Sequence, residues 1–337
     1  MLKNLALGAV SVILALLAVE AGLRVFSPDK GGEFIAISFS KDFVKNDKVT
    51  GLAGVPYAEG VCHNCETKVD YKLNSLGFRD IEHPVDKAPG KYRIMVLGDS
   101  FAWGVGVDRD AVFTRLLGEK DKPLEVINAS VPGWSTDSEY FYLENMGLKY
   151  KPDIAVVIFF VGNDAIGNGN YERSGFGNYQ SPSPEKKDAR FLSPKYIRDH
   201  SRIYRLWKRT RRELKVRLGL TPILTEYEDG SFDWKATEKW IDKFNGLADK
   251  NKFELLFVIA PDKNQFFLAK DPDRPQRLLR KYLDLRNINH LDLYPVFLDY
   301  KRRHERDWGY FKYDGHWNES GHRIVAESLY DIIRNNY

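Results

Sequence analysis

Short, almost uninterrupted apolar segments recur from residue 93 onward and restrict the fold of this chain more than any other feature. Such segments are typical of strands that are buried on both faces of a parallel sheet. Four are clear and one is weaker: 93–97, 124–129, 154–161, 253–259 and 290–293. Segments with helical spacing lie between or after them, at 138–149, 234–250, 275–285 and 319–333. This alternation predicts an α/β fold with a central parallel sheet over residues 91–337.

The start of the chain has a different composition. Residues 5–19 are apolar or small apart from Ser11, and Glu20 and Arg24 follow. The segment is shorter than the roughly 20 residues that span a bilayer, and it also fits the apolar part of a signal peptide. We favour an uncleaved signal anchor, a transmembrane helix within residues 1–27. A cleaved leader and a buried core helix are the alternatives.

The position of that segment suggests a location for the rest of the chain. The charges on its two sides are too evenly balanced for the positive-inside rule to give an orientation. A long domain after a first apolar segment is commonly translocated. We therefore expect a single-pass protein of the cell inner membrane, with its catalytic domain extracytoplasmic, on the periplasmic side.

Two further segments lie outside the regular pattern. Residues 28–90 carry scattered Gly and Pro and predict an irregular N-terminal extension. The connection between the third and fourth predicted strands is longer than an ordinary one and predicts an insertion at about 165–233. Within this connection, 162–184 reads as loop and 199–218 as a basic helix. That helix could be a lid or lie on anionic lipid, or it could be a surface helix packed by its apolar side. The apolar side consists of Ile203, Leu206, Trp207, Leu214 and Leu218.

Net charge and cysteine content exclude some classes of function. A net charge of +4 gives little support to nucleic-acid binding, so we expect no nucleic-acid partner. The only two cysteines, Cys62 and Cys65, exclude a multi-disulfide scaffold. With His63 they fall short of a four-ligand zinc site, so we expect no metal. A small-loop disulfide is favoured in an oxidising compartment, with a metal site or free thiols as alternatives.

The strongest chemical signal follows the first predicted strand, where Gly98, Asp99 and Ser100 occur in sequence. A serine at the carboxyl end of a parallel strand is exposed to substrate. Its hydroxyl needs a base to act as a nucleophile. Asp314 and His316 lie near the C-terminus, just before a predicted helix, at a spacing that lets the carboxylate orient the imidazole. An N-capping serine and a polar turn are the structural alternatives.

Other strand ends carry hydrogen-bond donors. Gly133 follows the second strand and Asn163 the third. A backbone N–H and an asparagine amide are donors of the kind that an oxyanion hole uses, although Gly and Asn also mark ordinary turns. His304 and His322 are rival bases, but neither has a carboxylate at a comparable spacing in a loop.

These motifs together, in this order, resemble the SGNH/GDSL hydrolase family over residues 92–337. The resemblance implies a flavodoxin-like three-layer α/β/α sandwich and no cofactor. It implies Ser100 as nucleophile, His316 as base and Asp314 as the residue that orients His316. The implied oxyanion hole consists of the Ser100 N–H, the Gly133 N–H and the Asn163 side chain.

The C-terminal motif departs from the common family pattern. The usual spacing is Asp–x–x–His, whereas here Asp314 and His316 are separated by one residue and Trp317 follows. This variant resembles the membrane-anchored branch that contains periplasmic alginate-type polysaccharide O-acetylation proteins. The likeness implies acyl transfer, to or from a glycan, beside a polytopic membrane O-acyltransferase.

The sequence therefore favours a serine esterase or O-acyltransferase acting on acyl esters of a glycan. The alternative is a catalytically silent member of the same fold that serves as a membrane-tethered binding or assembly subunit. A phosphate-handling enzyme using Asp99 is a remote third, because no Gly-rich phosphate loop with Lys is present. Arg79 could bind an anion or form a structural ion pair. Four aromatic residues near the motifs could stack on sugar rings or simply pack: Trp103, Trp134, Tyr171 and Trp317.

Overall fold

A five-stranded parallel sheet forms the centre of the protein in a computed structural model of the chain. The structure describes residues 2–26, 43–62, 66–121, 123–178, 201–217, 227, 230–267, 270–312 and 314–336. The strands are β5 (Tyr92–Gly98), β6 (Leu124–Ser130), β7 (Ile154–Phe160), β8 (Glu254–Ala260) and β9 (Asn289–Asp292). Their order in the sheet is β6-β5-β7-β8-β9. All five predicted strands are confirmed, with no bound that differs by more than one residue.

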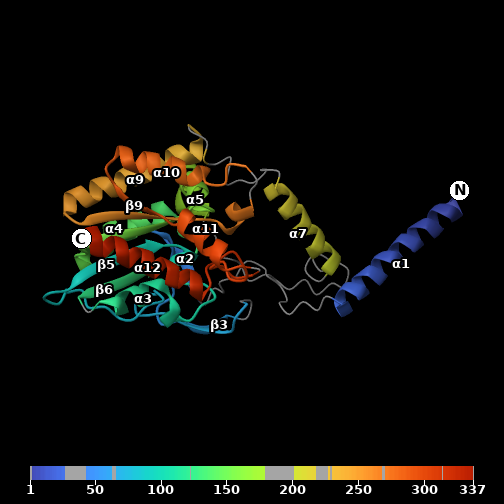
Figure 1. Cartoon of the computed structure of the whole chain (residues 1–337), viewed down its shortest axis with the longest axis horizontal. Coiled ribbons are helices and arrows are strands. Elements are labelled where there is room, and N and C mark those ends of the chain that lie inside the picture. The colour runs from blue at the N-terminus through green and yellow to red at the C-terminus, as the bar shows by residue number, and fades with distance from the viewer. Residues whose placement is uncertain are drawn as a thin grey trace.

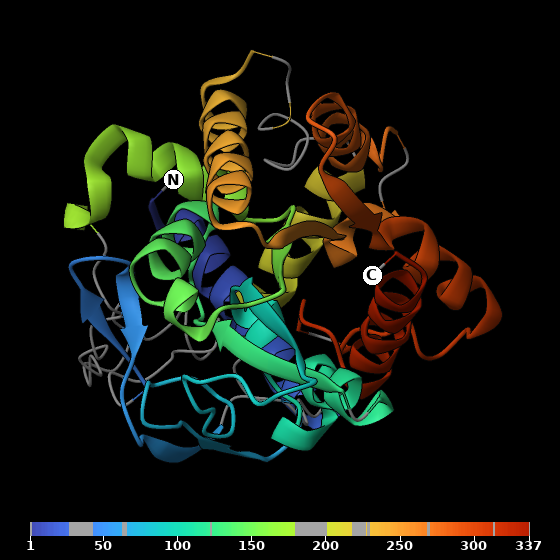
Figure 2. The ribbon, with the colours of Figure 1, turned by 90° about the vertical axis from the view of Figure 1, so that its left-hand side faces the viewer.

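Helices cover both faces of this sheet (Figures 1 and 2). One layer consists of α4 (Thr136–Asn145), α5 (Asp164–Ser174), α9 (Phe232–Asn251) and α10 (Arg274–Leu285). The other consists of α3 (Phe113–Lys120), α11 (Leu293–Arg303) and α12 (Glu319–Asn336). Alternate residues of β5 enter the two cores: Met95 and Leu97 the first, Ile94 and Val96 the second. The predicted three-layer α/β/α arrangement is confirmed.

The helix α5 corrects one prediction, because residues 162–184 read as loop in the sequence. Its Gly and Asn residues have low intrinsic helix propensity, so packing against α4 and α9 stabilises it instead. Buried Asn168 donates to Thr136 of α4 and Thr237 of α9. Gly169 permits the close approach, since a Cβ there would lie 1.8 Å from the Asp233 carboxylate of α9. The described residues up to 178 therefore belong to the sandwich rather than to an insertion.

The N-terminal extension is more regular than its sequence suggests. Two antiparallel hairpins form within it, β1 (Val44–Asp47) with β2 (Gly51–Gly54), and β3 (Glu59–Cys62) with β4 (Val69–Lys72). The strands have only four residues each, too few for a clear alternating pattern. Trp134 Nε1, after β6, donates to the Leu52 carbonyl at 2.6 Å, which fixes the first hairpin against the domain.

Short helical turns complete the described structure. They are α2 (Ser100–Trp103), η1 (Arg109–Ala111), η2 (Gly147–Tyr150), η3 (Gly175–Asn178) and η4 (Lys263–Phe267). The helix α2 starts at the carboxyl end of β5. Strand order reverses between β5 and β7, so this end of the sheet is where a doubly wound fold binds its ligands.

The transmembrane helix expected within residues 1–27 is present as a helix, α1 (Leu2–Phe26). Across the described part of the chain, no helix combines the length and apolar character that crossing a membrane requires.

The basic helix expected at 199–218 is present as α7 (Arg202–Arg217). Its apolar side was one reason to expect a packed surface helix. Leu206, Trp207 and Leu214 are instead each about half exposed. In Figure 1, α7 and α1 lie together at the end of the molecule away from the sheet. The packed arrangement is therefore wrong for these three side chains.

Candidate active site

The end of β5 presents a serine at the start of a short helix. Gly98 ends the strand, where a Cβ would lie 2.7 Å from the Ala102 side chain, so the tight turn into α2 requires glycine. Asp99 caps α2, since its Oδ1 accepts from the Phe101 N–H at 2.8 Å. Ser100 is thereby held at the first position of the helix and remains partly exposed.

A chain of hydrogen bonds joins three of the predicted site residues. His316 Nε2 lies 2.8 Å from Ser100 Oγ, and His316 Nδ1 lies 2.5 Å from Asp314 Oδ1. The His316 and Asp314 side chains are about one-fifth exposed, so both border solvent. Nucleophile, base and orienting carboxylate follow one another in the order that a serine triad requires.

The short spacing between Asp314 and His316 has a structural basis. Asp314 Oδ1 accepts from the backbone N–H of His316 at 2.7 Å as well as from its ring. One carboxylate oxygen therefore fixes both the backbone and the imidazole of the same residue. Burial would raise the pKa of Asp314, but the hydrogen bond and charge of His316 outweigh it and hold that pKa below the ordinary value. Asp314 is consequently a carboxylate near neutral pH.

Two charged side chains from elsewhere in the fold hold the loop that carries Asp314. Lys263 Nζ, in η4, donates to the carbonyls of Phe311, Lys312 and Asp314 at 2.5, 2.8 and 3.2 Å. Glu66, in the N-terminal extension, accepts from the backbone N–H groups of Lys312 and Asp314 at 3.1 and 2.8 Å. Neither residue could be identified from the sequence, because these hydrogen bonds go to backbone atoms of a distant segment.

The aromatic residue after His316 anchors the same loop to the core. Trp317 is fully buried, and its ring contacts those of Phe101, Phe297 and His322. Tyr310 and Trp317 form an isolated β-bridge that closes the base of the loop. His316 therefore extends from a rigid support.

Asn163, one of the predicted oxyanion donors, follows β7 and lies at the same end of the sheet as Ser100. Its Nδ2 donates to Asp99 Oδ2 at 2.8 Å, which ties it to the residue before the nucleophile. One of the two amide hydrogens is engaged in this bond, and an amide nitrogen carries two.

Gly133, the other predicted donor outside α2, lies in the turn that follows β6. Its φ is +88°, a left-handed conformation that favours glycine. The adjacent Val131 N–H donates to the Gly98 carbonyl at 3.2 Å, so this turn borders the end of β5. The loops that carry Gly133, Ser100 and Asn163 thus follow three neighbouring strands.

Behind the serine lies a group of buried acidic residues, Asp99, Asp137, Glu139 and Asp164, which we call the acidic cluster. Burial, reinforced by mutual repulsion, raises the pKa of Glu139 and of Asp164 well above ordinary values. Burial also raises the pKa of Asp99, and that of Asp137 to about 7. The carboxylate oxygens of Glu139 have no hydrogen-bond partner among the described residues. Sequence reasoning missed this cluster, because acidic residues at a helix start ordinarily face solvent.

The rival histidines do not reach Ser100. His322 is buried in the core, where its Nδ1 accepts from the Phe113 N–H at 3.4 Å. Burial lowers its pKa to about 3, so it is neutral. His304 is exposed at the end of α11 and stacks on Tyr300. The hydrogen bond to Ser100 therefore comes from His316.

The aromatic residues considered for sugar stacking pack instead. Trp103, Trp134 and Trp317 are buried, so that reading is wrong for all three. Tyr171 is partly buried against Phe141, Phe176 and Trp240.

Among the described residues, Arg79 bonds to backbone carbonyls and has no ion-pair partner. It is buried and donates to the carbonyls of Trp103, Gly104 and Val107. The guanidinium also lies over the rings of Tyr71 and Trp103. Arg79 therefore fixes the segment that follows the serine helix.

The Cys62–Cys65 disulfide favoured by the sequence lies partly outside the described residues, which end at Cys62 and resume at Glu66. Within those residues, no group of three or more His, Cys, Asp or Glu side chains is arranged to hold a metal ion.

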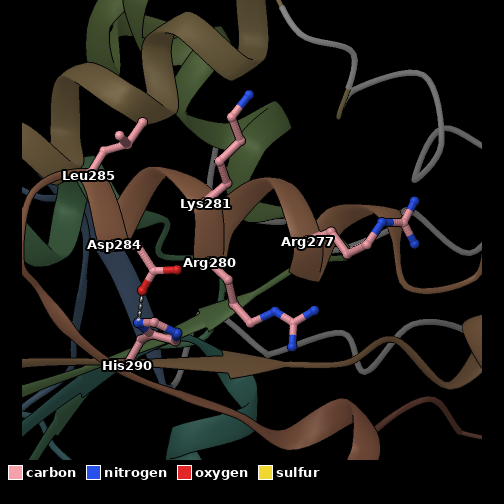
Figure 3. Close-up of a pocket in the computed structure, with 6 residues that line it drawn as sticks. All are labelled: Arg277, Arg280, Lys281, Asp284, Leu285 and His290. Carbon is pink, nitrogen blue, oxygen red and sulfur yellow. Dashed lines mark ion pairs between the residues drawn. The ribbon is translucent and has the colours of Figure 1, made fainter.

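A basic pocket lies between α10 and β9, away from the serine (Figure 3). Arg277 pairs there with Asp271 and Asp273, Arg280 lies 3.5 Å from Asp292, and His290 lies 3.7 Å from Asp284. Lys281 and Leu285 complete the lining. The pocket contains none of the predicted site residues, and its arginines are already paired with acids.

Comparison with known proteins gives one match by sequence family. Residues 96–324 match the family described as GDSL-like Lipase/Acylhydrolase. This segment contains Ser100, Gly133, Asn163, Asp314 and His316. No curated protein matches the chain.

Solved structures with a similar arrangement include three named esterases or lipolytic proteins. The acetyl xylan esterase AlAXEase is 17% identical, with a TM-score of 0.44, and the match covers 72% of this chain and 99% of that one. A lipolytic protein of the G-D-S-L family from Veillonella parvula DSM 2008 is 12% identical, with a TM-score of 0.42 over 72% and 98%. The psychrotrophic esterase EstA from Pseudoalteromonas sp. is 11% identical, with a TM-score of 0.41 over 73% and 98%.

Proposed function

Because this chain belongs to the GDSL-like lipase/acylhydrolase family, we propose that it is a serine ester hydrolase or O-acyltransferase. The observation that carries the proposal is the hydrogen-bond chain from Ser100 through His316 to Asp314. A subunit that only binds or assembles has no physical need for this arrangement. It is the arrangement that makes a serine hydroxyl nucleophilic.

In the proposed reaction, Ser100 Oγ attacks the carbonyl carbon of an ester while His316 Nε2 takes the hydroxyl proton. The resulting tetrahedral intermediate collapses, the ester C–O bond breaks, and His316 returns the proton to the leaving alcohol. An acyl-Ser100 remains. Water in a hydrolase, or a sugar hydroxyl in a transferase, then gives its proton to His316 and attacks the acyl carbon. The bond between the acyl carbon and Ser100 Oγ breaks, and His316 returns the proton to Ser100.

The developing oxyanion is held by the Ser100 N–H, the Gly133 N–H and the Asn163 amide. The support is that these residues follow the neighbouring strands β5, β6 and β7 at one end of the sheet. Removing one such donor typically costs about 3–4 kcal/mol of transition-state stabilisation. Asp314 stabilises the imidazolium that forms on His316, and its lowered pKa keeps it charged for this role.

The substrate we propose is an acyl ester, most simply an acetyl ester, of a glycan. Its support is the Asp–x–His–Trp sequence at residues 314–317, which resembles that of polysaccharide O-acetylation proteins. The buried Trp103, Trp134 and Trp317 add nothing to this proposal, since they cannot stack on a sugar.

We also propose that the chain is attached to the inner membrane through α1 and works on the periplasmic side. The support is the surface of α1, where side chains from Leu7 to Phe26 expose apolar atoms that lipid would cover. In a transferase, a polytopic membrane O-acyltransferase would supply the acyl group across the membrane.

The test is hydrolysis of p-nitrophenyl acetate by the full chain in detergent, compared with Ser100→Ala and His316→Ala. We expect turnover in the wild type and its loss in both variants, with circular dichroism unchanged. Covalent labelling by a fluorophosphonate should occur at Ser100 in the wild type only. Absence of both turnover and labelling in the wild type would favour the silent binding subunit.

A second assay distinguishes hydrolase activity from transferase activity. The acyl-Ser100 enzyme is formed from p-nitrophenyl acetate in the presence of an oligosaccharide, and the products are identified by mass spectrometry. Acetylated sugar identifies a transferase, whereas free acetate alone identifies a hydrolase for that acceptor.

A further inference from the structure

The helix α7 combines strong positive charge with an uncovered apolar face. Its sixteen residues include eight Arg or Lys and one Glu. Leu206, Trp207 and Leu214 are 52%, 52% and 55% exposed. Their spacing places them on one face of a helix. In a protein that only meets water, such a face is ordinarily packed against the domain.

The start of α7 is fixed to α1 by polar contacts rather than by that apolar face. The Glu20 carboxylate, on α1, accepts from the backbone N–H groups of Arg202 and Ile203 at 2.9 and 3.0 Å and from Ser201 Oγ at 3.1 Å. Arg202 Nη1 donates back to the Leu23 carbonyl at 3.0 Å. Glu20 thus caps α7, and the apolar face of α7 stays free of this junction.

This cap ties α7 to the end of α1, a helix with many exposed apolar side chains, so both helices meet the same surroundings (Figure 1).

We propose that α7 lies on an anionic lipid surface, with Leu206, Trp207 and Leu214 inserted at the level of the lipid headgroups. The proposal rests on the membrane attachment proposed above for α1. A helix with a basic polar side and an apolar side that carries Trp and Leu is typical of interfacial helices. Acidic headgroups complement its excess of seven positive charges. An acidic protein surface would complement the charge of α7 but not the exposed apolar side chains of α1 beside it.

Trp207 is a natural probe for this contact. The chain has seven tryptophans, and five of them are at most 2% exposed: Trp103, Trp134, Trp234, Trp240 and Trp317. Trp308 is half-buried and contacts Phe267. A quencher in the lipid therefore reports mainly on Trp207.

The experiment mixes the full chain with vesicles of brominated phosphatidylcholine, with or without phosphatidylglycerol, and measures tryptophan fluorescence. Flotation of the vesicles measures attachment separately. We expect quenching that requires phosphatidylglycerol, most of which is lost in Trp207→Phe and none in the matched control Trp308→Phe. Arg211→Glu should weaken it, whereas Lys281→Glu, the same charge change on α10, should not.

Three results would overturn the proposal. One is quenching of equal size in Trp207→Phe, and another is quenching that is indifferent to phosphatidylglycerol. The third is protein that floats with the vesicles while Trp207 stays unquenched, which would leave attachment through α1 intact but remove α7 from the surface. Hydrolysis of p-nitrophenyl acetate by the same variants should be unchanged, so a failure here is separate from a failure of the proposed catalysis.

Discussion

Two sets of carboxyl groups lie near Ser100, and the fold treats them in opposite ways. Asp314 borders solvent and binds His316 through ring and backbone, which lowers its pKa. The acidic cluster lies behind the serine without solvent, and there burial raises the pKa of each member. Partner and environment, rather than residue type, decide whether a carboxyl is charged.

The two sets of carboxyl groups therefore have different roles. A charged carboxylate next to His316 can stabilise an imidazolium during catalysis. Carboxyl groups whose pKa is raised by burial in the interior act through packing and hydrogen bonds, so their effect falls on stability. Asn163 connects the two regions. Its side-chain amide donates to Asp99 of the acidic cluster, and the same amide is a proposed donor to the oxyanion.

The change with the largest expected effect is Asp314→Asn. Asparagine removes the charge and can donate to Nδ1, which favours the wrong imidazole tautomer. We expect kcat to fall by about 10³–10⁴-fold, by analogy with the same change in serine proteases. Ester hydrolysis across pH measures it, with Asp284→Asn on the far surface as control. A loss below tenfold would mean that Asp314 and the acidic cluster do not differ in role.

Asn163→Ala should have the next largest effect. A donor to the oxyanion acts only in the transition state, so we expect kcat to fall by about 10²–10³-fold with KM unchanged. Steady-state kinetics at several ester concentrations measure both constants. A rise in KM as large as the expected fall in kcat, with kcat itself unchanged, would instead indicate that Asn163 contributes to ground-state binding of the substrate.

Lys263→Met tests how the loop around Asp314 is held. The substitution removes three hydrogen bonds to the carbonyls of that loop. Misplacement of His316 should lower kcat by roughly tenfold with little change in KM and displace the pH profile of kcat/KM. Lys301→Met is the matched control, because Lys301 donates to Phe266 instead. Rescue by Lys263→Arg is expected, and a pure loss of stability without a kinetic effect would contradict the positioning role.

The smallest effect on activity is expected from Asp137→Asn in the acidic cluster, which should act on stability. The folded pKa of Asp137 is about 7 against an ordinary 3.8, so the native state holds a proton that the unfolded state releases. Its contribution to stability is complete below about pH 4 and is lost as pH rises to about 7. The full shift corresponds to roughly 4 kcal/mol.

Urea denaturation at intervals between pH 4 and pH 8 measures how the free energy of unfolding depends on pH. The wild type should lose stability over the interval, the Asn variant should lose less, and Asp70→Asn, at an exposed position of β4, should match the wild type. Hydrolysis at pH 7 should change by less than a factor of about two, since only groups that act in the transition state alter kcat. Identical slopes in wild type and Asp137→Asn would show that Asp137 is charged in the fold.

The strands and the triad could be predicted from sequence because their signals are local. A continuous apolar segment such as 154–161 permits little other than a buried strand, and the motif residues follow strand ends directly. Asp314 and His316 are so close in sequence that their contact needs no knowledge of the fold.

The remaining features depend on contacts between distant segments. The helix α5 forms despite its Gly and Asn content because α4 and α9 bind Asn168. Glu139 has the position of a solvent-facing residue in a helix start, and only the packing of α4 on the sheet buries it. Glu66 and Lys263 bind backbone atoms, which leave no pattern in the sequence of their partner segment.

The bond between Glu66 and the loop around Asp314 also bears on when the enzyme becomes active. Glu66 lies in the N-terminal extension, and its two hydrogen-bond partners, Lys312 and Asp314, follow it in the sequence by 246 and 248 positions. Contacts of such long sequence separation carry a large closure entropy and tend to form late in folding. Until the C-terminal segment has been synthesised and has folded, the chain therefore contains Ser100 without a working base. Esterase turnover is then a measure of complete synthesis and folding.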